Sequence, residues 1–350
     1  MKYILSFIIL PVLFSNCCLS KKPFSFMDSL NQLQSIELID EFETYIPDIE
    51  SIINFVDSLD NLGISHPHYY GIGIDLGLNI ANNGSWDTLN NGDRVWRIKI
   101  ICLNAFTINI EFEKFQLAEN SNISFYSVSG SSLLGSYYSD INRTDSLFST
   151  HLINGDTAII ELYEPLIDFG KNTFTINKIV YGFSDVISEK FLFKEARVQS
   201  DYCLVDANCE EGDEFCREKY SITRILTSSP LDQSLYTLCS GSLLNNTSLD
   251  YHPYLLTAFH CIDDGTGSLS QNEKDNANNW VIQLGYIKEN CGSGSSLQTY
   301  EYYGAEFLAG WNQVKTDFVL LELLEDPKSG ETLRENRRAN FIHDRNEKRK

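Results

Sequence analysis

The spacing of hydrophobic residues changes along this chain and divides it into regions. Between residues 24 and 62 these residues recur at mixed intervals of three and four, which is typical of one face of a helix. They are Leu30, Leu33, Ile36, Ile39 and Phe42, followed by Ile49, Ile52, Ile53 and Val56. We therefore predict a helical or partly ordered connector over residues 24–68.

From Tyr69 onward the hydrophobic spacing becomes two. Residues 96–100, 108–113 and 158–162 each alternate between apolar and polar side chains, the pattern of strands that bury one face and expose the other. Turn residues separate such strands, at positions 91–93 and 154–156. Residues 69–184 are therefore expected to form an antiparallel β-sandwich with Trp96 among its buried residues. No group of carboxylates or histidines in this region suggests a reaction.

The composition supports the same fold class. The chain has 350 residues, 43% of them hydrophobic, which is enough for two ordinary domains with separate cores. Eighteen Tyr and 21 Phe, against two Met, favour β structure, so we predict an all-β protein. The formal net charge of −21 argues against nucleic acid as a partner, because binding phosphate requires a cationic surface.

Residues 1–20 have the features of a secretory signal peptide. Lys2 supplies the positive charge, and residues 4–14 form an apolar core that is too short to span a membrane. A secreted or periplasmic protein is expected. An outer-membrane lipoprotein acylated at Cys17 is the alternative, although Asn16 fits that motif poorly. No later stretch is long and apolar enough for a membrane span.

Seven cysteines remain after the signal segment. Cys102 stands alone, whereas the other six lie within the 89 residues from Cys203 to Cys291. In an exported chain, such crowding indicates a disulfide framework confined to the second half.

A metal site is not predicted. Cys203, Cys209 and Cys216 are six and seven residues apart, not the two to four that zinc sites use. His66 and His68 flank a proline and are expected to lie on a surface loop. No cofactor is predicted either.

One pair of motifs carries chemistry. Leu256-Thr257-Ala258-Phe259-His260-Cys261 is followed by Asp317, which opens the apolar run Phe318-Val319-Leu320-Leu321. A histidine after a strand, or an aspartate before one, is ordinary when it occurs singly. A histidine that accepts a proton and a carboxylate that orients it are, however, two of the three members of a serine-protease triad.

These motifs, together with Cys239-Ser240-Gly241-Ser242-Leu243-Leu244, resemble lysyl endopeptidase and its secreted relatives of the trypsin-like (chymotrypsin-fold) group. The resemblance implies that residues 203–327 form a C-terminally truncated peptidase domain containing the first of two β-barrels. It assigns His260 as general base and Asp317 as its orienting carboxylate. It also implies two disulfides, Cys239–Cys261 and Cys209–Cys291.

Two cysteines and one neighbour depart from the family pattern. Cys203 resembles a family cysteine whose partner lies near the far C-terminus, so here it is expected to be free or paired with the extra Cys216. Phe259 stands where a small residue or a histidine is usual. This changes local packing without removing the base.

The first half also carries a resemblance. Seven short blocks follow the order seen in the pro-region of secreted bacterial trypsin-like proteases, at residues 73–76, 84–87, 91–97, 123–126, 154–156, 162–165 and 179–183. This implies a pro-domain over residues 69–184 that packs on the peptidase domain. The linker 185–202 holds Lys190, Lys194 and Arg197, where a zymogen would be cut. An uncleaved inter-domain linker is an equal alternative.

The nucleophile expected of the family is absent. Nothing after Asp317 reads Gly-Asp-Ser-Gly; Ser293, Ser295 and Ser296 precede Asp317, and Ser329 follows it too closely. The oxyanion hole and specificity pocket would come from residues beyond those printed, so the preferred cleavage site cannot be carried over from the resemblance.

The last 23 residues differ in composition from the rest. Residues 1–327 hold 19 Lys+Arg and 44 Asp+Glu, a net of −25, whereas residues 328–350 hold eight and four, a net of +4. We interpret this anomalous basic tail as the result of a frameshift, a truncated gene model or an early stop. A basic helical tail with its own role is the lesser alternative.

The sequence therefore predicts a secreted serine endopeptidase zymogen that acts on proteins or peptides through an acyl-enzyme but has little or no activity as written. The alternative is a non-catalytic secreted β-sandwich binding module with a relic protease half. That alternative requires Trp86 and Trp96 to face solvent together in a concave patch.

Overall fold

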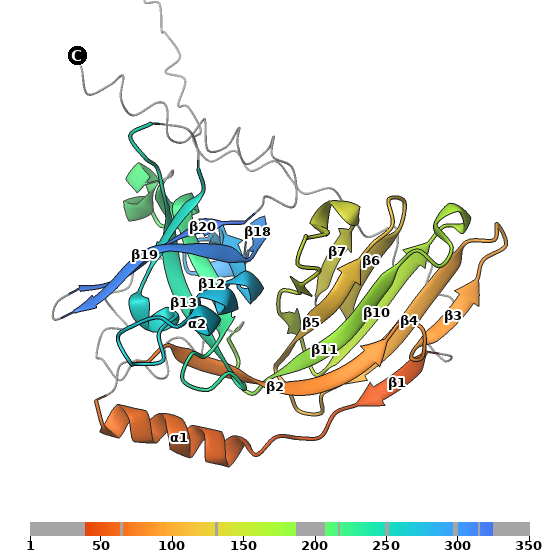
Figure 1. Ribbon diagram of the computed structural model, residues 1–350, viewed down its shortest axis with the longest axis horizontal. Coiled ribbons are helices and arrows are strands. Elements are labelled where there is room, and N and C mark those ends of the chain that lie inside the picture. The colour runs from red at the N-terminus through yellow and green to blue at the C-terminus, as the bar shows by residue number, and fades with distance from the viewer. Residues whose placement is uncertain are drawn as a thin grey trace, which may run out of the picture.

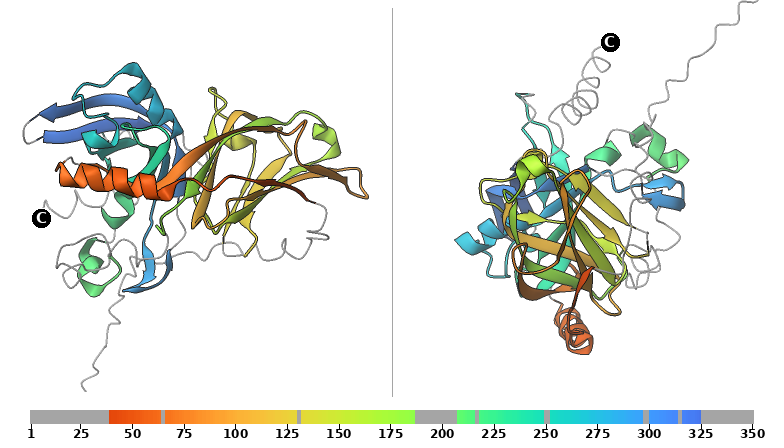
Figure 2. Two further views of the ribbon diagram at one scale, coloured as in Figure 1. Left: turned by 90° about the horizontal axis from the view of Figure 1, so that it is seen from below. Right: turned by 90° about the vertical axis from the view of Figure 1, so that its right-hand side faces the viewer.

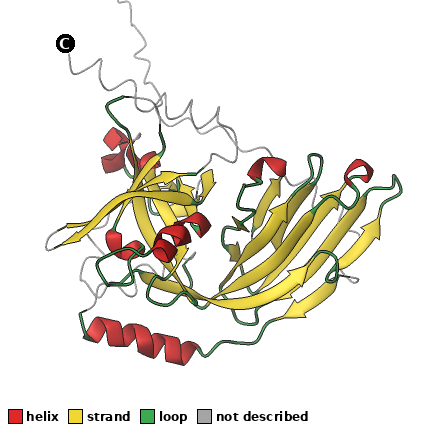
Figure 3. Ribbon diagram, viewed as in Figure 1, coloured by secondary structure: helices red, strands yellow, loops and turns green. Residues whose placement is uncertain are grey.

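The computed structural model describes residues 39–63, 66–129, 132–186, 207–215, 218–248, 252–296, 300–313 and 316–324. The predictions for the signal segment, for nearly all of the 185–202 linker, for Cys203 and Cys216 and for the basic tail lie outside these residues. Within them the chain is mostly strand, as Figures 1 and 3 show, and the all-β prediction is confirmed. Among the described residues, no helix combines the length and apolar character that a membrane crossing needs.

Two sheets face each other in the first half, here called the N-terminal module (residues 40–182). One sheet runs in the order β1, β4, β10, β6, β7, with β3 on β4. The other contains β2, β11 and β5, with β8 and β9 on the outer edge of β5. The strands are β1 (Asp40–Glu43), β2 (His68–Asn79), β3 (Ser85–Thr88), β4 (Arg94–Ile101), β5 (Thr107–Gln116), β6 (Asn122–Ser127), β7 (Leu133–Tyr137), β8 (Phe148–Ser149), β9 (Ile153–Asn154), β10 (Thr157–Glu164) and β11 (Thr173–Gly182).

Alternating side chains of the two sheets form the core between them. Trp96, Ile98 and Ile100 of β4 are all buried, as the period of two predicted. Trp96 packs edge-to-face on Phe174 of β11, with ring centroids 5.2 Å apart, and donates its indole N–H to the Asn83 carbonyl at 2.7 Å. The bond satisfies the one polar atom that this ring brings into the core.

The helical prediction for residues 24–68 is only partly right. Helix α1 spans Ile49–Asn61, but β1 (Asp40–Glu43) is a strand that pairs in parallel with β4. The free edge of β4 offers hydrogen bonds to an extended chain, and this pairing outweighs the local spacing of apolar residues. Residues 24–38 lie outside the described residues. Helix α1 places Ile52 and Leu59 against Tyr69 and Leu235.

The second half forms a nearly closed antiparallel barrel, here called the barrel (residues 222–323). Its strands pair around a ring in the order β12, β13, β14, β20, β19, then β18, β15 and back to β12. Strands β18 and β19 are separated only by Gly304, so they form one continuous side of the ring. The strands are β12 (Ile222–Ser228), β13 (Leu235–Leu244), β14 (Tyr254–Thr257), β15 (Val281–Leu284), β18 (Tyr300–Tyr303), β19 (Ala305–Gln313) and β20 (Thr316–Leu323).

The barrel has its own core, made by inward residues of most of its strands. Ile225, Leu255, Ile282, Val319 and Leu321 are completely buried there. Outside the ring lie helix α2 (Gln271–Asn276) and the hairpin of β16 (Lys288–Asn290) with β17 (Ser293–Ser296).

Strand β13 joins the two halves. Its first part, Leu235–Leu238, pairs with β2 of the N-terminal module, and its last part, Gly241–Leu244, pairs with β14 along the same edge. The barrel and one sheet of the N-terminal module are therefore a single 12-stranded sheet, and β2 bridges them in Figures 1 and 2.

Polar side chains also bond across this junction. Tyr236 of β13 donates to Glu111 of β5 at 2.6 Å, and Tyr137 of β7 donates to Glu301 of β18 at 2.9 Å. Glu301 is buried and Glu111 partly buried, and Tyr236 and Tyr137 are both buried, so these bonds lie within a packed junction.

Candidate active site

His260 lies on a short turn that is joined to β13 by one hydrogen bond and one disulfide. Strand β14 ends at Thr257, and the 3₁₀ turn η7 (Phe259–Cys261) follows directly. The Thr257 hydroxyl donates to the Ser240 carbonyl at 2.7 Å, and Cys261 forms a disulfide with Cys239. The backbone is thus fixed on both sides of His260.

The cysteine pairs are those that the resemblance implied. Cys239 bonds to Cys261, and Cys209 bonds to Cys291 across 82 residues of sequence. The remaining described cysteine, Cys102, is buried in the N-terminal module as a thiol, and burial raises its pKa to about 11. A thiol with that pKa is a poor nucleophile at neutral pH, so nothing in its environment suggests catalysis.

Asp317, near the start of β20, holds the histidine turn through both carboxylate oxygens. Its Oδ2 lies 2.6 Å from His260 Nδ1, while Oδ1 accepts the backbone N–H groups of Phe259 at 2.7 Å and His260 at 3.1 Å. Because the carboxylate can only accept, His260 carries a proton on Nδ1 and presents Nε2 as the basic nitrogen.

The same contacts set the charge state of Asp317. Partial burial acts to raise its pKa, but the hydrogen bonds from the His260 side chain and from the two backbone N–H groups outweigh burial and hold the pKa below its ordinary value. Asp317 is therefore an anion at neutral pH.

Asp317 is more exposed than the buried aspartate of a serine-protease triad. Its side chain is 46% exposed and that of His260 is 33% exposed. The reason is its position: Thr316, Asp317 and Phe318 all lie at the exposed outer end of β20, where only β19 is paired with them. Water therefore screens the His260–Asp317 interaction more than it would inside a closed site.

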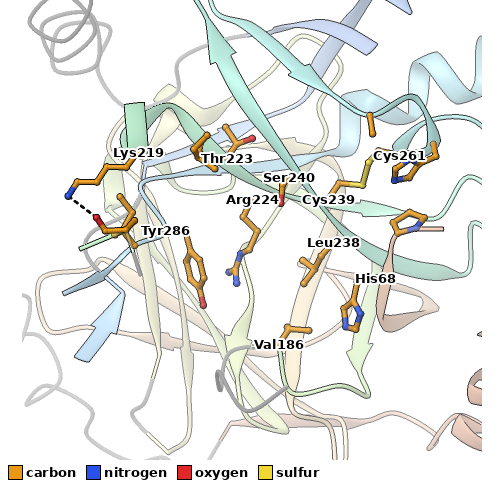
Figure 4. A pocket seen from close by; sticks show the side chains of 16 residues that line it. His68, Val186, Lys219, Thr223, Arg224, Leu238, Cys239, Ser240, Cys261 and Tyr286 are labelled. Carbon is orange, nitrogen blue, oxygen red and sulfur yellow. Dashed lines mark hydrogen bonds between the residues drawn. A yellow bond between two sulfur atoms is a disulfide. The ribbon is translucent and has the colours of Figure 1, made fainter. Parts of the chain in front are cut away.

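A cavity of about 630 Å³ has His260 in its wall, and Figure 4 shows the side chains that line it. It lies between the barrel and the N-terminal module. Its walls come from β12, β13 and the histidine turn on one side and from the start of β2 on the other. The lining includes Ser240, Arg224, Tyr286, Leu238, His68 and Val186.

His68 does not lie where its sequence context predicted. It was expected on a surface loop, but it opens β2, pairs with Leu238 of β13 and lines this cavity, where burial lowers its pKa. Arg224 was also missed. The pairing of β2 with β13 joins segments some 170 residues apart in sequence, and neither segment carries a local pattern that indicates the other.

No described serine occupies the nucleophile position. His260 Nε2 makes no hydrogen bond with any residue that the structure describes, and Ser240, which shares the cavity with it, makes none to it. The backbone of Ser293–Ser296 lies in the β16–β17 hairpin, and Ser329 is outside the described residues.

Three acidic residues come close enough to share a cation, namely Asp263, Asp264 and Glu273. Asp263 accepts the N–H groups of Gly265 and Gly267, and Glu273 accepts those of Ser270 and Asp264. These are turn and helix-cap contacts that satisfy the carboxylates without a metal, and we assign no metal to them.

The binding-module alternative loses the patch it required. Trp96 is fully buried, and Trp86 is covered by the Arg94 guanidinium, 4.0 Å from its ring centroid. The two rings therefore do not form an open aromatic surface together.

The second half of the chain matches a known protein family. Residues 198–340 match the family model described as "Lysyl endopeptidase, C-terminal domain". The matched segment includes His260, Asp317 and the four disulfide-bonded cysteines, and it covers less than half of the chain. The second half of the chain, with this geometry, is therefore similar to the C-terminal domain of lysyl endopeptidase.

Proposed function

We propose that this protein is a secreted precursor of a trypsin-like serine endopeptidase, in which His260 is the general base and Asp317 orients it. The observation that carries the proposal is the triple contact of Asp317 with the histidine turn, which fixes the imidazole with Nε2 directed away from the carboxylate. A histidine held in this tautomer is ready to take a proton from a hydroxyl.

The reaction also needs a serine nucleophile and groups that stabilise an oxyanion. His260 would remove the proton of a serine hydroxyl as the oxygen attacks a peptide carbonyl, and Asp317 would stabilise the imidazolium; the imidazolium then protonates the leaving amine, and water hydrolyses the acyl-enzyme. Backbone N–H groups must also stabilise the oxyanion. The 350 printed residues hold no Gly-Asp-Ser-Gly segment, so we expect them alone to have little or no peptidase activity.

The tautomer of His260 is the direct test of its role. Nitrogen NMR of the ¹⁵N-histidine-labelled chain is expected to find that the neutral ring of His260 carries its proton on Nδ1, and Asp317→Asn is expected to shift the ring toward the other tautomer. His252, which has its own 2.6 Å contact with Glu322 on the same strand, serves as an internal reference. A predominantly Nε2-protonated His260 would contradict the proposed role.

Labelling by a serine-directed reagent tests whether the chain lacks peptidase activity. The purified chain is expected to resist labelling by a fluorophosphonate and to leave a protein substrate intact. Ser240→Ala is the matched control for labelling at the cavity, because Ser240 has the one serine hydroxyl among the cavity-lining residues. Labelling that disappears in His260→Ala would show that the chain already contains a working nucleophile.

A further inference from the structure

Arg224 projects into the cavity from the outer face of the barrel. On β12, Ile225 points into the barrel core, so the alternation of the strand directs Arg224 the other way, toward the N-terminal module. Figure 4 shows its guanidinium between Tyr286 and Leu238, in the same cavity that His260 lines.

The partners of Arg224 are neutral. Its Nε donates to Gln283 Oε1 at 3.0 Å, its Nη2 lies 2.9 Å from His151 Nε2, and the Tyr286 ring lies under it with the centroid 3.7 Å from Cζ. Burial, followed by the charge of Arg224 itself, lowers the pKa of His151 to about 4, so His151 is uncharged at neutral pH.

The positive charge is not matched by an ion pair. Arg224 makes no salt bridge with any carboxylate in the described part of the chain. Glu301, the acidic residue whose field reaches it, instead accepts hydrogen bonds from Tyr137 and Tyr303. A guanidinium has five N–H donors. Gln283 and His151 accept at most two of them, because His151 Nε2 also lies 2.8 Å from Gln283 Oε1; even if the Tyr286 hydroxyl accepts a third, at least two remain.

The rest of the cavity favours a charged ligand at this point. Leu238, Val186 and Ile287 supply apolar walls that keep water from screening Arg224. Lys219 also lines the cavity, but its ammonium donates to the Ala207 carbonyl and to Asn208 Oδ1. The volume of about 630 Å³ lies in the range of small-ligand sites, about 300–1,000 Å³.

We infer that this cavity is a binding site for a peptide carboxylate, with Arg224 as the residue that pairs with the anion. The planar guanidinium suits bidentate recognition of a carboxylate, and the peptide would reach it past His260. The carboxylate could belong to an acidic side chain or to a free C-terminus. The inference does not require His260 to be catalytic, because it concerns binding at equilibrium.

Three capped tripeptides separate the possible ligands. Acetyl-Ala-Ala-Asp-amide carries only a side-chain carboxylate, acetyl-Ala-Ala-Ala carries only a C-terminal one, and acetyl-Ala-Ala-Asn-amide is the neutral match of the first. Calorimetric titration of the full chain at low salt is expected to show at least one acidic peptide binding about 10- to 100-fold more tightly than the neutral one, the range of a charge-assisted hydrogen bond. Titration measures equilibrium binding without turnover, so its result separates the site from the proposed reaction.

Variants assign the preference to Arg224. Arg224→Gln is expected to abolish it and Arg224→Lys to keep part of it. Arg143→Gln is the matched control, since Arg143 is also a largely buried arginine at the junction, bonded to the Asn278 carbonyl, but it does not line the cavity.

A second measurement uses the unaltered chain, in case Arg224→Gln does not fold. The preferred acidic peptide is expected to slow modification of Arg224 by phenylglyoxal, mapped by mass spectrometry, while the neutral peptide does not. Equal binding of acidic and neutral peptides by the folded chain, or a preference that survives Arg224→Gln, would overturn the inference.

Discussion

Replacing Asp317 by alanine removes the acceptor of three hydrogen bonds in one step, two from the backbone N–H groups of Phe259 and His260 and one from the imidazole. Each such bond contributes about 0.5–1.5 kcal/mol, and more when the acceptor is charged. With the Asp317 side chain 46% exposed, water replaces part of what is lost, so we expect local opening to become easier by about 2 kcal/mol.

The assay is amide hydrogen exchange at Phe259 and His260. An opening free energy lower by about 2 kcal/mol corresponds to exchange roughly 30-fold faster. Glu322→Ala is the control, because Glu322 lies on the same strand and contacts a histidine, His252, at 2.6 Å on the surface. A surface pair of this kind contributes about 0–1 kcal/mol, and its loss should leave the amides of the His260 turn unchanged.

The effect of Asp317 should depend on pH in a defined direction. Its pKa is lower in the folded protein than its ordinary value, so its stabilising contribution is complete above about pH 4, the unfolded value, and is lost as the pH falls through the folded pKa. The difference between the wild type and Asp317→Ala should therefore disappear in acid. Equal exchange rates in the two proteins at pH 7, or a difference that persists in strong acid, would refute the assigned contacts.

Three further predictions concern stability. Removing the Cys239–Cys261 bridge by a double change to serine should lower the free energy of unfolding by about 3 kcal/mol in denaturant titration, because the bridge closes a loop with a sequence separation of 22; no change would indicate that the pair is open. Gly304→Ala should cost about 2 kcal/mol or more in the same titration, since Gly304 has φ +80° and an added Cβ would meet the Asn278 carbonyl oxygen at 2.7 Å; a neutral effect would contradict that geometry. His151 should make the protein less stable as the pH falls from about 6.5 toward about 4, because the unfolded chain takes up the proton that the buried ring refuses, and His151→Gln should flatten the pH profile of the thermal midpoint over this window.

The local pattern predicted much of the fold. Alternation identified β4 and the buried side of Trp96, because a strand that buries one face must repeat every two residues. The helical spacing of apolar residues gave the wrong prediction at β1, where pairing with the edge of β4 determines the structure. The local pattern also could not place His68 or Arg224 in one cavity, since that depends on a contact between β2 and β13 that leaves no periodic trace in either strand.

The sequence likewise predicted some properties of the candidate site and not others. His260 and Asp317 were identified by their motifs, and the structure brings them to 2.6 Å. The motif could not indicate how exposed they are, because the exposure of Asp317 depends on what packs over the outer end of β20, which is not encoded in the residues next to it.

The shared edge of β13 has a consequence for maturation. If the chain were cut between its halves and the N-terminal module dissociated, the backbone of Leu235–Leu238 would lose its pairing with strand β2. A bare strand edge readily recruits another chain, which leads to aggregation or exchange. Release would also uncover Leu235, which now packs against Tyr69 and helix α1 of the N-terminal module. A cut chain should therefore persist as a nicked complex, and its separation into two soluble parts would require another strand to take the place of β2.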